Sequence, residues 1–177
     1  MMDKRKRLWM RVAILGVLLG ALVFAVYSSF AKDNKEIKIG MQAPNFSLEQ
    51  LNANGKELKL SDLKGKGVVL NFWGSWCEPC KAEFPELEKQ FQRYKADGIE
   101  IVGVNISETP LAIQQFVDQY RVSFPILMDR QSEITRIYQI GPIPTTFFIN
   151  KDGVVQDQFI GQMSESTIIQ KINKIKP

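Results

Sequence analysis

Cys77 and Cys80 are the only two cysteines of this chain, and they lie two residues apart in the stretch NFWGSWCEPCKAEFP, residues 71–85. Residues i and i+3 on the first turn of a helix are about 5 Å apart, which is within reach of a disulfide bond. A disulfide that closes so short a loop stabilises a fold little, because its stabilising effect grows with loop length. The spacing therefore favours a reversible redox pair over a structural bond.

Other uses of two close thiols are limited by what the chain lacks. A zinc site needs four ligands, and the chain offers two cysteines and no histidine. The absence of histidine also excludes Ser-His-Asp and Cys-His catalysis, and Lys81 after Cys80 excludes haem attachment through Cys-x-x-Cys-His. No metal or organic cofactor is implied. An inert structural disulfide and two buried thiols without function stay open as alternatives.

The residues before the cysteines predict how the two thiols differ. VVLNFW, residues 68–73, is a continuous apolar run that predicts a strand buried on both faces and leading into the pair. Cys77 is then expected at the start of a helix with its sulfur toward solvent, where free N–H groups and the helix dipole favour a thiolate. Cys80 is expected to be more buried. We predict that Cys77 attacks a substrate disulfide and that Cys80 resolves the mixed disulfide.

The rest of the domain predicts the elements that position this pair. Strands alternate with amphipathic helices, which implies an α/β fold with a mostly parallel sheet, helices on both faces and an antiparallel edge. The expected strands lie at 45–50, 57–60, 68–73 and 99–107 and in IPTTFFIN and VVQDQFIG. The expected helices lie at 80–98, 111–120 and 133–138 and in SESTIIQKINKIK.

The first 35 residues carry all of the chain's excess positive charge. They hold a net charge of +5, whereas the remainder holds −1, so the domain offers no cationic surface for a nucleic acid. Residues 12–31 contain no charged side chain and match the hydrocarbon thickness of a bilayer. The basic residues before them should stay in the cytoplasm, which places the domain outside the cell, where disulfides persist. A cleavable signal peptide ending at Ser29-Phe30-Ala31 is the competing interpretation.

Two motifs and the leader together resemble a known family. FWGSWCEPC and the downstream IPTT are similar to the thioredoxin superfamily. The N-terminal anchor, the predicted hairpin and the Glu-Pro dipeptide more narrowly resemble the membrane-tethered, extracytoplasmic ResA proteins of Gram-positive bacteria, in the TlpA-like branch. The resemblance implies a thioredoxin fold with a central mixed sheet flanked by helices and an added N-terminal β-hairpin at 41–177. A cytoplasmic basic stub with a transmembrane signal-anchor, 1–31, and a linker, 32–40, are expected to precede it.

The same resemblance implies a function. We expect a single-pass protein of the cell membrane whose domain reduces protein disulfides on the extracytoplasmic face and acts as a monomer. The implied substrate is the Cys-x-x-Cys-His disulfide of apocytochrome c during cytochrome c maturation, and the implied electron donor is a CcdA-type membrane protein. The alternatives are a reductase of spore-envelope or other exported proteins, a thiol peroxidase of related fold, and a binding module with an inert disulfide.

Resemblance also assigns residues around the thiols. Glu83 lies three residues beyond Cys80, hence on its side of the helix, and the family suggests a partly buried acid that exchanges protons with the thiols. Glu108 matches a family acidic position near the thiols. Pro144 matches the superfamily's cis-proline beside the disulfide, where the backbone of Ile143 is expected to pair with an extended substrate.

The remaining candidates adjoin Cys77 in sequence. Glu78 places a carboxylate beside the pair, where a like charge would disfavour the thiolate and favour a reducing couple. A solvated glutamate that complements the helix dipole is the alternative. Pro79 suits the first helical turn. Trp76 is expected to form part of an apolar, aromatic surface that receives protein substrates.

Overall fold

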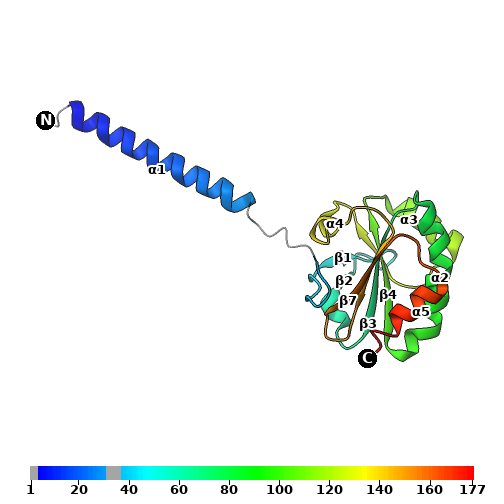
Figure 1. Ribbon diagram of the computed structural model, residues 1–177. Coiled ribbons are helices and arrows are strands. Elements are labelled where there is room, and N and C mark those ends of the chain that lie inside the picture. Colours follow the sequence, from blue (N-terminus) through cyan, green and yellow to red (C-terminus); the bar gives the residue numbers. More distant parts are fainter. Residues whose placement is uncertain (1–3, 31–36) are drawn as a thin grey trace. The chain divides into compact units, whose positions relative to one another are not determined.

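The computed structural model of the chain describes residues 4–30 and 37–177 (Figure 1). The chain divides into two compact units, Met1–Glu36 and Ile37–Pro177, and helix α1, Lys4–Phe30, belongs to the first. Within the described part of the chain, no helix is long and apolar enough to cross a membrane. The transmembrane anchor therefore stays a prediction.

The second unit begins inside the predicted linker. Residues 31–36, which hold the end of the predicted anchor and the first part of the linker, lie outside the described residues. Ile37 is buried in the core of the second unit, and Gly40 donates a backbone hydrogen bond to Val155. The residues just before the expected boundary at residue 41 are thus part of the folded domain.

A five-stranded mixed sheet forms the centre of the domain, in the order β5-β4-β3-β6-β7. Strands β3, β4 and β5 are parallel, β6 is antiparallel to β3, and β7 is antiparallel to β6. The predicted parallel sheet with an antiparallel edge is confirmed, and β5 is a strand that the sequence did not predict. The strands are Gly67–Trp73 (β3), Ile99–Ile106 (β4), Ile126–Asp129 (β5), Thr145–Ile149 (β6) and Val155–Ile160 (β7).

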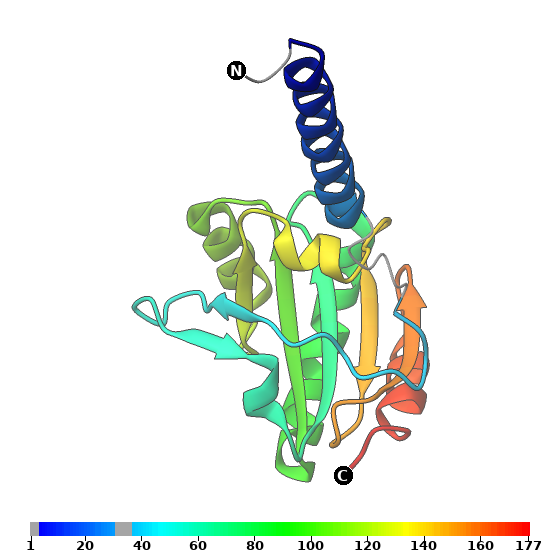
Figure 2. The ribbon, with the colours of Figure 1, turned by 90° about the vertical axis from the view of Figure 1, so that its left-hand side faces the viewer.

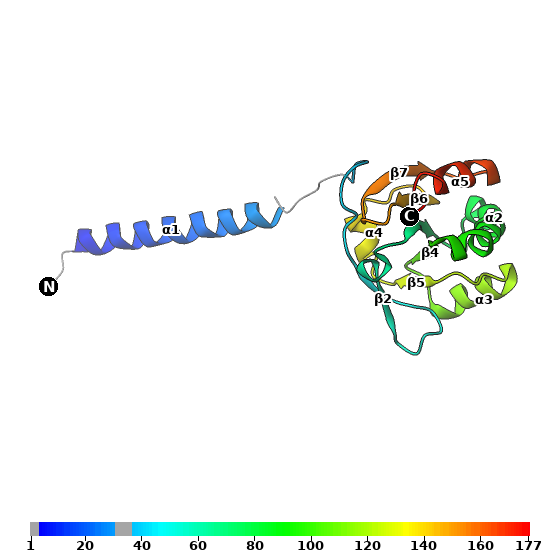
Figure 3. The same ribbon diagram turned by 90° about the horizontal axis from the view of Figure 1, so that it is seen from below.

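Helices and a hairpin cover the two faces of this sheet. One face carries α2, Glu78–Tyr94, α3, Pro110–Tyr120, and α5, Glu165–Ile172 (Figures 1 and 3). The other face carries α4, Glu133–Ile137, and the predicted hairpin of β1, Ser47–Glu49, and β2, Glu57–Lys59. Short 3-10 helices at Leu60–Leu63 and Lys95–Asp97 follow the hairpin and α2.

Strand β3 divides the core into two halves because its side chains alternate between the faces. All seven of its residues are buried. Val69 and Trp73 join the cluster under α2, α3 and α5, whereas Leu70 and Phe72 join the cluster under the hairpin and α4. Trp73 packs against Phe84 of α2 with ring centroids 4.6 Å apart, and this contact holds the start of α2 against the end of β3.

The hairpin lies at the β5 edge of its face of the sheet and projects beyond that edge, as Figure 2 shows. The segment that leads into the hairpin is fixed by Tyr138, which follows α4. The hydroxyl of Tyr138 donates a 2.7 Å hydrogen bond to the carbonyl oxygen of Pro44. The ring of Tyr138 also packs edge-on against Phe46. Leu51 at the end of the hairpin donates its N–H to the carbonyl oxygen of Ile126, so the hairpin reaches the free edge of β5.

Candidate active site

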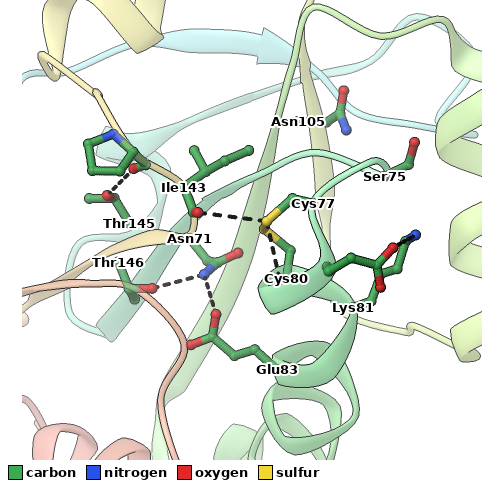
Figure 4. The surroundings of a disulfide bond; sticks show 12 residues. Asn71, Ser75, Cys77, Cys80, Lys81, Glu83, Asn105, Ile143, Thr145 and Thr146 are labelled. Atoms are coloured by element: carbon green, nitrogen blue, oxygen red, sulfur yellow. Dashed lines mark hydrogen bonds and ion pairs between the residues drawn. A yellow bond between two sulfur atoms is a disulfide. The ribbon is translucent and has the colours of Figure 1, made fainter.

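Cys77 and Cys80 form a disulfide at the junction of β3 and α2 (Figure 4). Their Cα atoms are 5.3 Å apart, as expected for positions i and i+3. Cys77 is the N-cap residue of α2, and its Sγ accepts a 3.2 Å hydrogen bond from the backbone N–H of Cys80. The first sulfur of the pair thus lies where the free N–H groups of the helix stabilise negative charge, as predicted.

The two cysteines differ in burial. Cys80 is fully buried and Cys77 is 5% exposed, so the prediction that Cys80 is the more buried residue is confirmed. Cys77 was expected to have its sulfur toward solvent, but in the oxidised form the residue is buried and only a small part of it is accessible. One neighbour is the carbonyl oxygen of Ile143, which lies 3.7 Å from its Sγ.

The peptide bond between Ile143 and Pro144 is cis, as the resemblance implied. The backbone of Pro144 is anchored to the segment after β7, because its carbonyl oxygen accepts a 2.8 Å hydrogen bond from the N–H of Gly161. The N–H of Ile143 makes no hydrogen bond to any residue that the structure describes. A half-buried segment with a free backbone donor therefore lies directly beside Cys77.

Glu83 lies one turn after Cys80 and is fully buried, not partly buried as predicted. Its carboxylate accepts two hydrogen bonds of 3.4 Å, one from the side-chain amide of Asn71 and one from the backbone N–H of Met163. Burial raises the pKa of Glu83 to about 7, and these two bonds lower it by less. A carboxyl group with this pKa exchanges its proton near neutral pH, which suits an acid or base beside a thiol pair.

Asn71, which bonds Glu83, and Thr146, which bonds Asn71, were not predicted from the sequence as site residues. Asn71 is a buried residue of β3, and its Nδ2 donates to Glu83 and, at 2.8 Å, to Oγ1 of Thr146 on β6 (Figure 4). An asparagine inside the apolar run VVLNFW was the available signal, since a polar side chain in a doubly buried strand needs partners.

Glu108 contacts the loop before Cys77 rather than the sulfurs. Its carboxylate accepts hydrogen bonds from the backbone N–H of Ser75, at 2.7 Å, and from the Ser75 hydroxyl. It also accepts a 2.6 Å bond from the side-chain amide of Asn105, which is buried at the end of β4. Glu108 therefore fixes the segment that carries Trp76 and Cys77, and Ser75 is a second residue that the sequence did not single out.

Glu78 and Pro79 occupy the first turn of α2. The Glu78 side chain is 80% exposed and forms a 2.5 Å ion pair with Lys81. This hydrogen bond, opposed by some burial, raises the pKa of Lys81. The arrangement matches a solvated helix-start glutamate whose charge is offset by a cation, and Pro79 lies at a helical position that needs no N–H partner.

Trp76 is the large apolar side chain exposed closest in sequence to the disulfide. The residue is 65% exposed, and its indole folds back over Gly74, where an added Cβ would lie 2.8 Å from Nε1. A side chain at position 74 would therefore displace the indole from this position. The exposed ring adjoins Cys77 in sequence, and its predicted role in contacting a polypeptide stays a prediction.

A helix-capping disulfide, a cis-proline beside it and a buried acid behind it, on a mixed sheet flanked by helices, define a thioredoxin-fold thiol-disulfide oxidoreductase. Similar proteins agree. The chain is 46% identical to the thiol-disulfide oxidoreductase ResA of Bacillus subtilis (strain 168) over 99% of this chain and 97% of that protein. Residues 39–158 match the AhpC/TSA family. The chain therefore belongs to the AhpC/TSA family and to the ResA group of thiol-disulfide oxidoreductases.

Two solved structures share the fold of the domain. A thiol:disulfide interchange protein of the thioredoxin family from Chlorobium tepidum TLS is 25% identical, with a TM-score of 0.70, over 78% of this chain and 97% of that one. StoA from Bacillus subtilis is 27% identical, with a TM-score of 0.63, over 75% of this chain and 98% of that one. Both likenesses extend over nearly the whole of the compared structures.

Proposed function

We propose that this chain is a membrane-anchored reductant of protein disulfides on the extracytoplasmic face. The observation that carries the proposal is the backbone at Ile143, whose carbonyl oxygen lies 3.7 Å from Sγ of Cys77 and whose N–H makes no hydrogen bond within the described residues. An extended polypeptide pairs with such a segment as an added strand, and this brings its disulfide to the accessible edge of Cys77. Trp76 then supplies an apolar contact beside the backbone pairing.

The proposed substrate is the oxidised Cys-x-x-Cys-His segment of apocytochrome c, which must be reduced before haem is attached. Cys77 attacks the substrate disulfide and forms a mixed disulfide, and Cys80 then attacks the Cys77 sulfur and releases the reduced substrate. The proposed donor that restores the dithiol is a CcdA-type membrane protein. The similarity to ResA oxidoreductases over nearly the whole chain supports this choice.

The proposed location follows from the leader. Residues 4–7 are basic and residues 12–31 carry no charge, which favours a single span with its N-terminus in the cytoplasm. The domain then acts as a monomer outside the membrane. Reduction of spore-envelope or other exported proteins uses the same chemistry and is the first alternative, and a thiol peroxidase is the second.

Substrate trapping separates these possibilities. In a Cys80→Ala variant the mixed disulfide on Cys77 cannot be resolved, so the substrate stays covalently attached and is identified by mass spectrometry after non-reducing electrophoresis. Apocytochrome c on Cys77 would support the proposal, whereas only spore-envelope or other exported proteins would support the first alternative. The Cys77→Ala/Cys80→Ala chain is the control, because it has no thiol with which to trap a protein.

The reduction potential decides the direction of electron flow. Equilibration of the chain with dithiothreitol or glutathione buffers can be followed by the fluorescence of Trp73 and Trp76, which both lie shortly before Cys77 in the sequence. A potential below about −230 mV, nearer to thioredoxin than to disulfide isomerase, would support a reductant. A potential above about −180 mV would make the protein an oxidant or isomerase and would refute the proposal. Rapid turnover of hydrogen peroxide would instead favour the peroxidase.

A further inference from the structure

The side-chain amide of Asn71 uses its nitrogen in hydrogen bonds, whereas its oxygen has no partner among the described residues. Both hydrogens of Nδ2 are used, one on Glu83 and one on Thr146. Its Oδ1 is buried and accepts no hydrogen bond from any residue that the structure describes. A buried carbonyl oxygen without a donor destabilises a fold by about 1–3 kcal/mol. Because such groups are rare in folded proteins, we expect this oxygen to gain a hydrogen-bond donor when the cysteine pair is reduced.

The surroundings of the Asn71 side chain indicate which group could donate a hydrogen bond to its Oδ1. Asn71 lies on the face of β3 that α2 covers, and it bonds Glu83, which is one turn along α2 from Cys80. In Figure 4 the nitrogen of Asn71 points to Glu83 and Thr146, and its oxygen points to the side of Cys80. A disulfide sulfur has no hydrogen to donate, so the oxygen stays unpaired while the pair is oxidised.

The orientation of the amide is fixed by its neighbours. An ionised Glu83 can only accept hydrogen bonds, so the nitrogen of Asn71 must face it and the oxygen must face the other way. Two groups bond Glu83, the side-chain amide of Asn71 from β3 and the N–H of Met163 from the loop before α5, and the same amide also bonds Thr146 of β6. In the part of the chain that the structure describes, no charged side chain competes for the amide.

We propose that Asn71 is a positioning residue that accepts the S–H hydrogen bond of Cys80 in the dithiol form. When a dithiol reduces the pair, the S–S bond breaks and two S–H bonds form, and the dithiol is oxidised to a disulfide with the loss of two electrons and two protons. The Cys77 thiol then has the carbonyl oxygen of Ile143 as acceptor. The fully buried Cys80 thiol has Oδ1 of Asn71.

This bond would do two things in the reaction. It would hold the Cys80 thiol in one orientation during the attack on the substrate, so that its sulfur is in place when the mixed disulfide forms on Cys77. It would also link the thiol to Glu83 through one rigid amide, because the same side chain contacts both. The inference rests on the thiol-disulfide chemistry of the pair and not on the proposed substrate, so the two can fail separately.

The S–H stretching band tests the proposal directly, using the full-length chain in detergent at pH 7.5. The chain has two cysteines, so in a Cys77→Ala variant the band in the Raman spectrum comes from Cys80 alone. The S–H stretching band of a thiol that donates a hydrogen bond lies at lower frequency than the band of a free thiol. Adding Asn71→Leu, which removes the acceptor at similar volume, should move the band to the frequency of a free thiol.

Asn105→Leu is the matched control. Asn105 is a buried asparagine on the neighbouring strand β4, and its Oδ1 also has no hydrogen-bond partner in the described part of the chain. It should leave the band unchanged, and Asn71→Asp, which keeps an oxygen at the site, should keep the band at lower frequency. If Asn71→Leu does not fold, Asn71→Ala removes the same acceptor. An unchanged band on loss of Asn71, or an equal change on loss of Asn105, would overturn the proposal.

A second measurement uses the intact pair. Since the bond exists only in the reduced form, its loss in Asn71→Leu should disfavour reduction. The equilibrium constant for reduction by dithiothreitol should fall about tenfold, which is about 30 mV for a two-electron couple. An equilibrium constant that stays at the parent value or rises would contradict the assignment, and Asn105→Leu again serves as the control.

Discussion

The Glu83→Gln substitution should change how the stability of the domain depends on pH. Glu83 is fully buried, and burial raises its pKa from 4.5 to about 7. Between these two values the folded state holds a proton on Glu83 that the unfolded state has released. Because the folded state binds more protons in this window, the free energy of unfolding falls as the pH rises through it.

The size of the effect follows from the two pKa values. One pKa unit corresponds to about 1.4 kcal/mol, so an ionised Glu83 destabilises the fold by about 3 kcal/mol above pH 7. Gln carries no charge, but its amide cannot accept the bonds of both Asn71 and Met163, which costs about 1 kcal/mol at every pH. The variant should be less stable than the parent at pH 4 and more stable at pH 8.

Urea unfolding of the oxidised unit 37–177, followed by tryptophan fluorescence between pH 2 and 8, measures this difference. Asp157→Asn is a control of opposite sign. Burial raises the pKa of Asp157, but hydrogen bonds from Lys174 and Lys171 outweigh it and lower the pKa overall. Its loss should therefore destabilise the domain near neutral pH, by an amount that shrinks as the pH falls below the ordinary value of 3.8. If the parent and Glu83→Gln curves are parallel, Glu83 does not titrate as a buried acid.

Three other substitutions test the surroundings of the pair. Glu108→Ala removes a charged acceptor from Ser75, so hydrogen exchange at the Ser75 amide should accelerate about tenfold or more; unchanged exchange would show that Glu108 does not hold this loop. Tyr138→Phe leaves the Pro44 carbonyl without its donor and should lower the free energy of unfolding by about 1 kcal/mol in a urea titration. Glu78→Gln should leave the dithiothreitol equilibrium constant within about twofold of the parent, because Glu78 is exposed and paired with Lys81. A larger shift toward the reduced form would restore the predicted influence of its charge on the thiolate.

The sequence predicted well wherever a local pattern decides the structure. The apolar run of β3, the spacing of Cys77 and Cys80, and the hairpin turn are set by neighbours in the chain. The cis bond at Pro144 came from resemblance alone, since cis is a minority state that no local pattern reveals. Strand β5 was missed because four buried residues, ILMD, are too few to show a period.

The inner part of the site was harder to predict because distant segments build it. A helix glutamate is usually exposed, but Glu83 is fully buried and bonded by Asn71 and Met163, which come from other segments of the chain. The tie between Ser75 and Glu108 likewise joins the ends of two strands. Parallel pairing of β3 with β4 brings these ends together, and that pairing is a property of the sheet rather than of either strand.

Two layers of the site have separable tasks. Trp76 and Ile143 lie at the accessible edge of Cys77, whereas Cys80 and Glu83 are fully buried. A protein substrate can contact only the first layer, so Trp76→Ala should raise KM for a protein disulfide and leave the pH profile of kcat at the parent shape. Glu83→Gln should change the pH profile of kcat and leave KM at the parent value, because it removes the group that titrates near pH 7 and leaves the contact surface intact. If Trp76→Ala also moved the pH profile, substrate contact and proton exchange would be coupled, and the oxidised geometry would not describe the state in which the protein reacts.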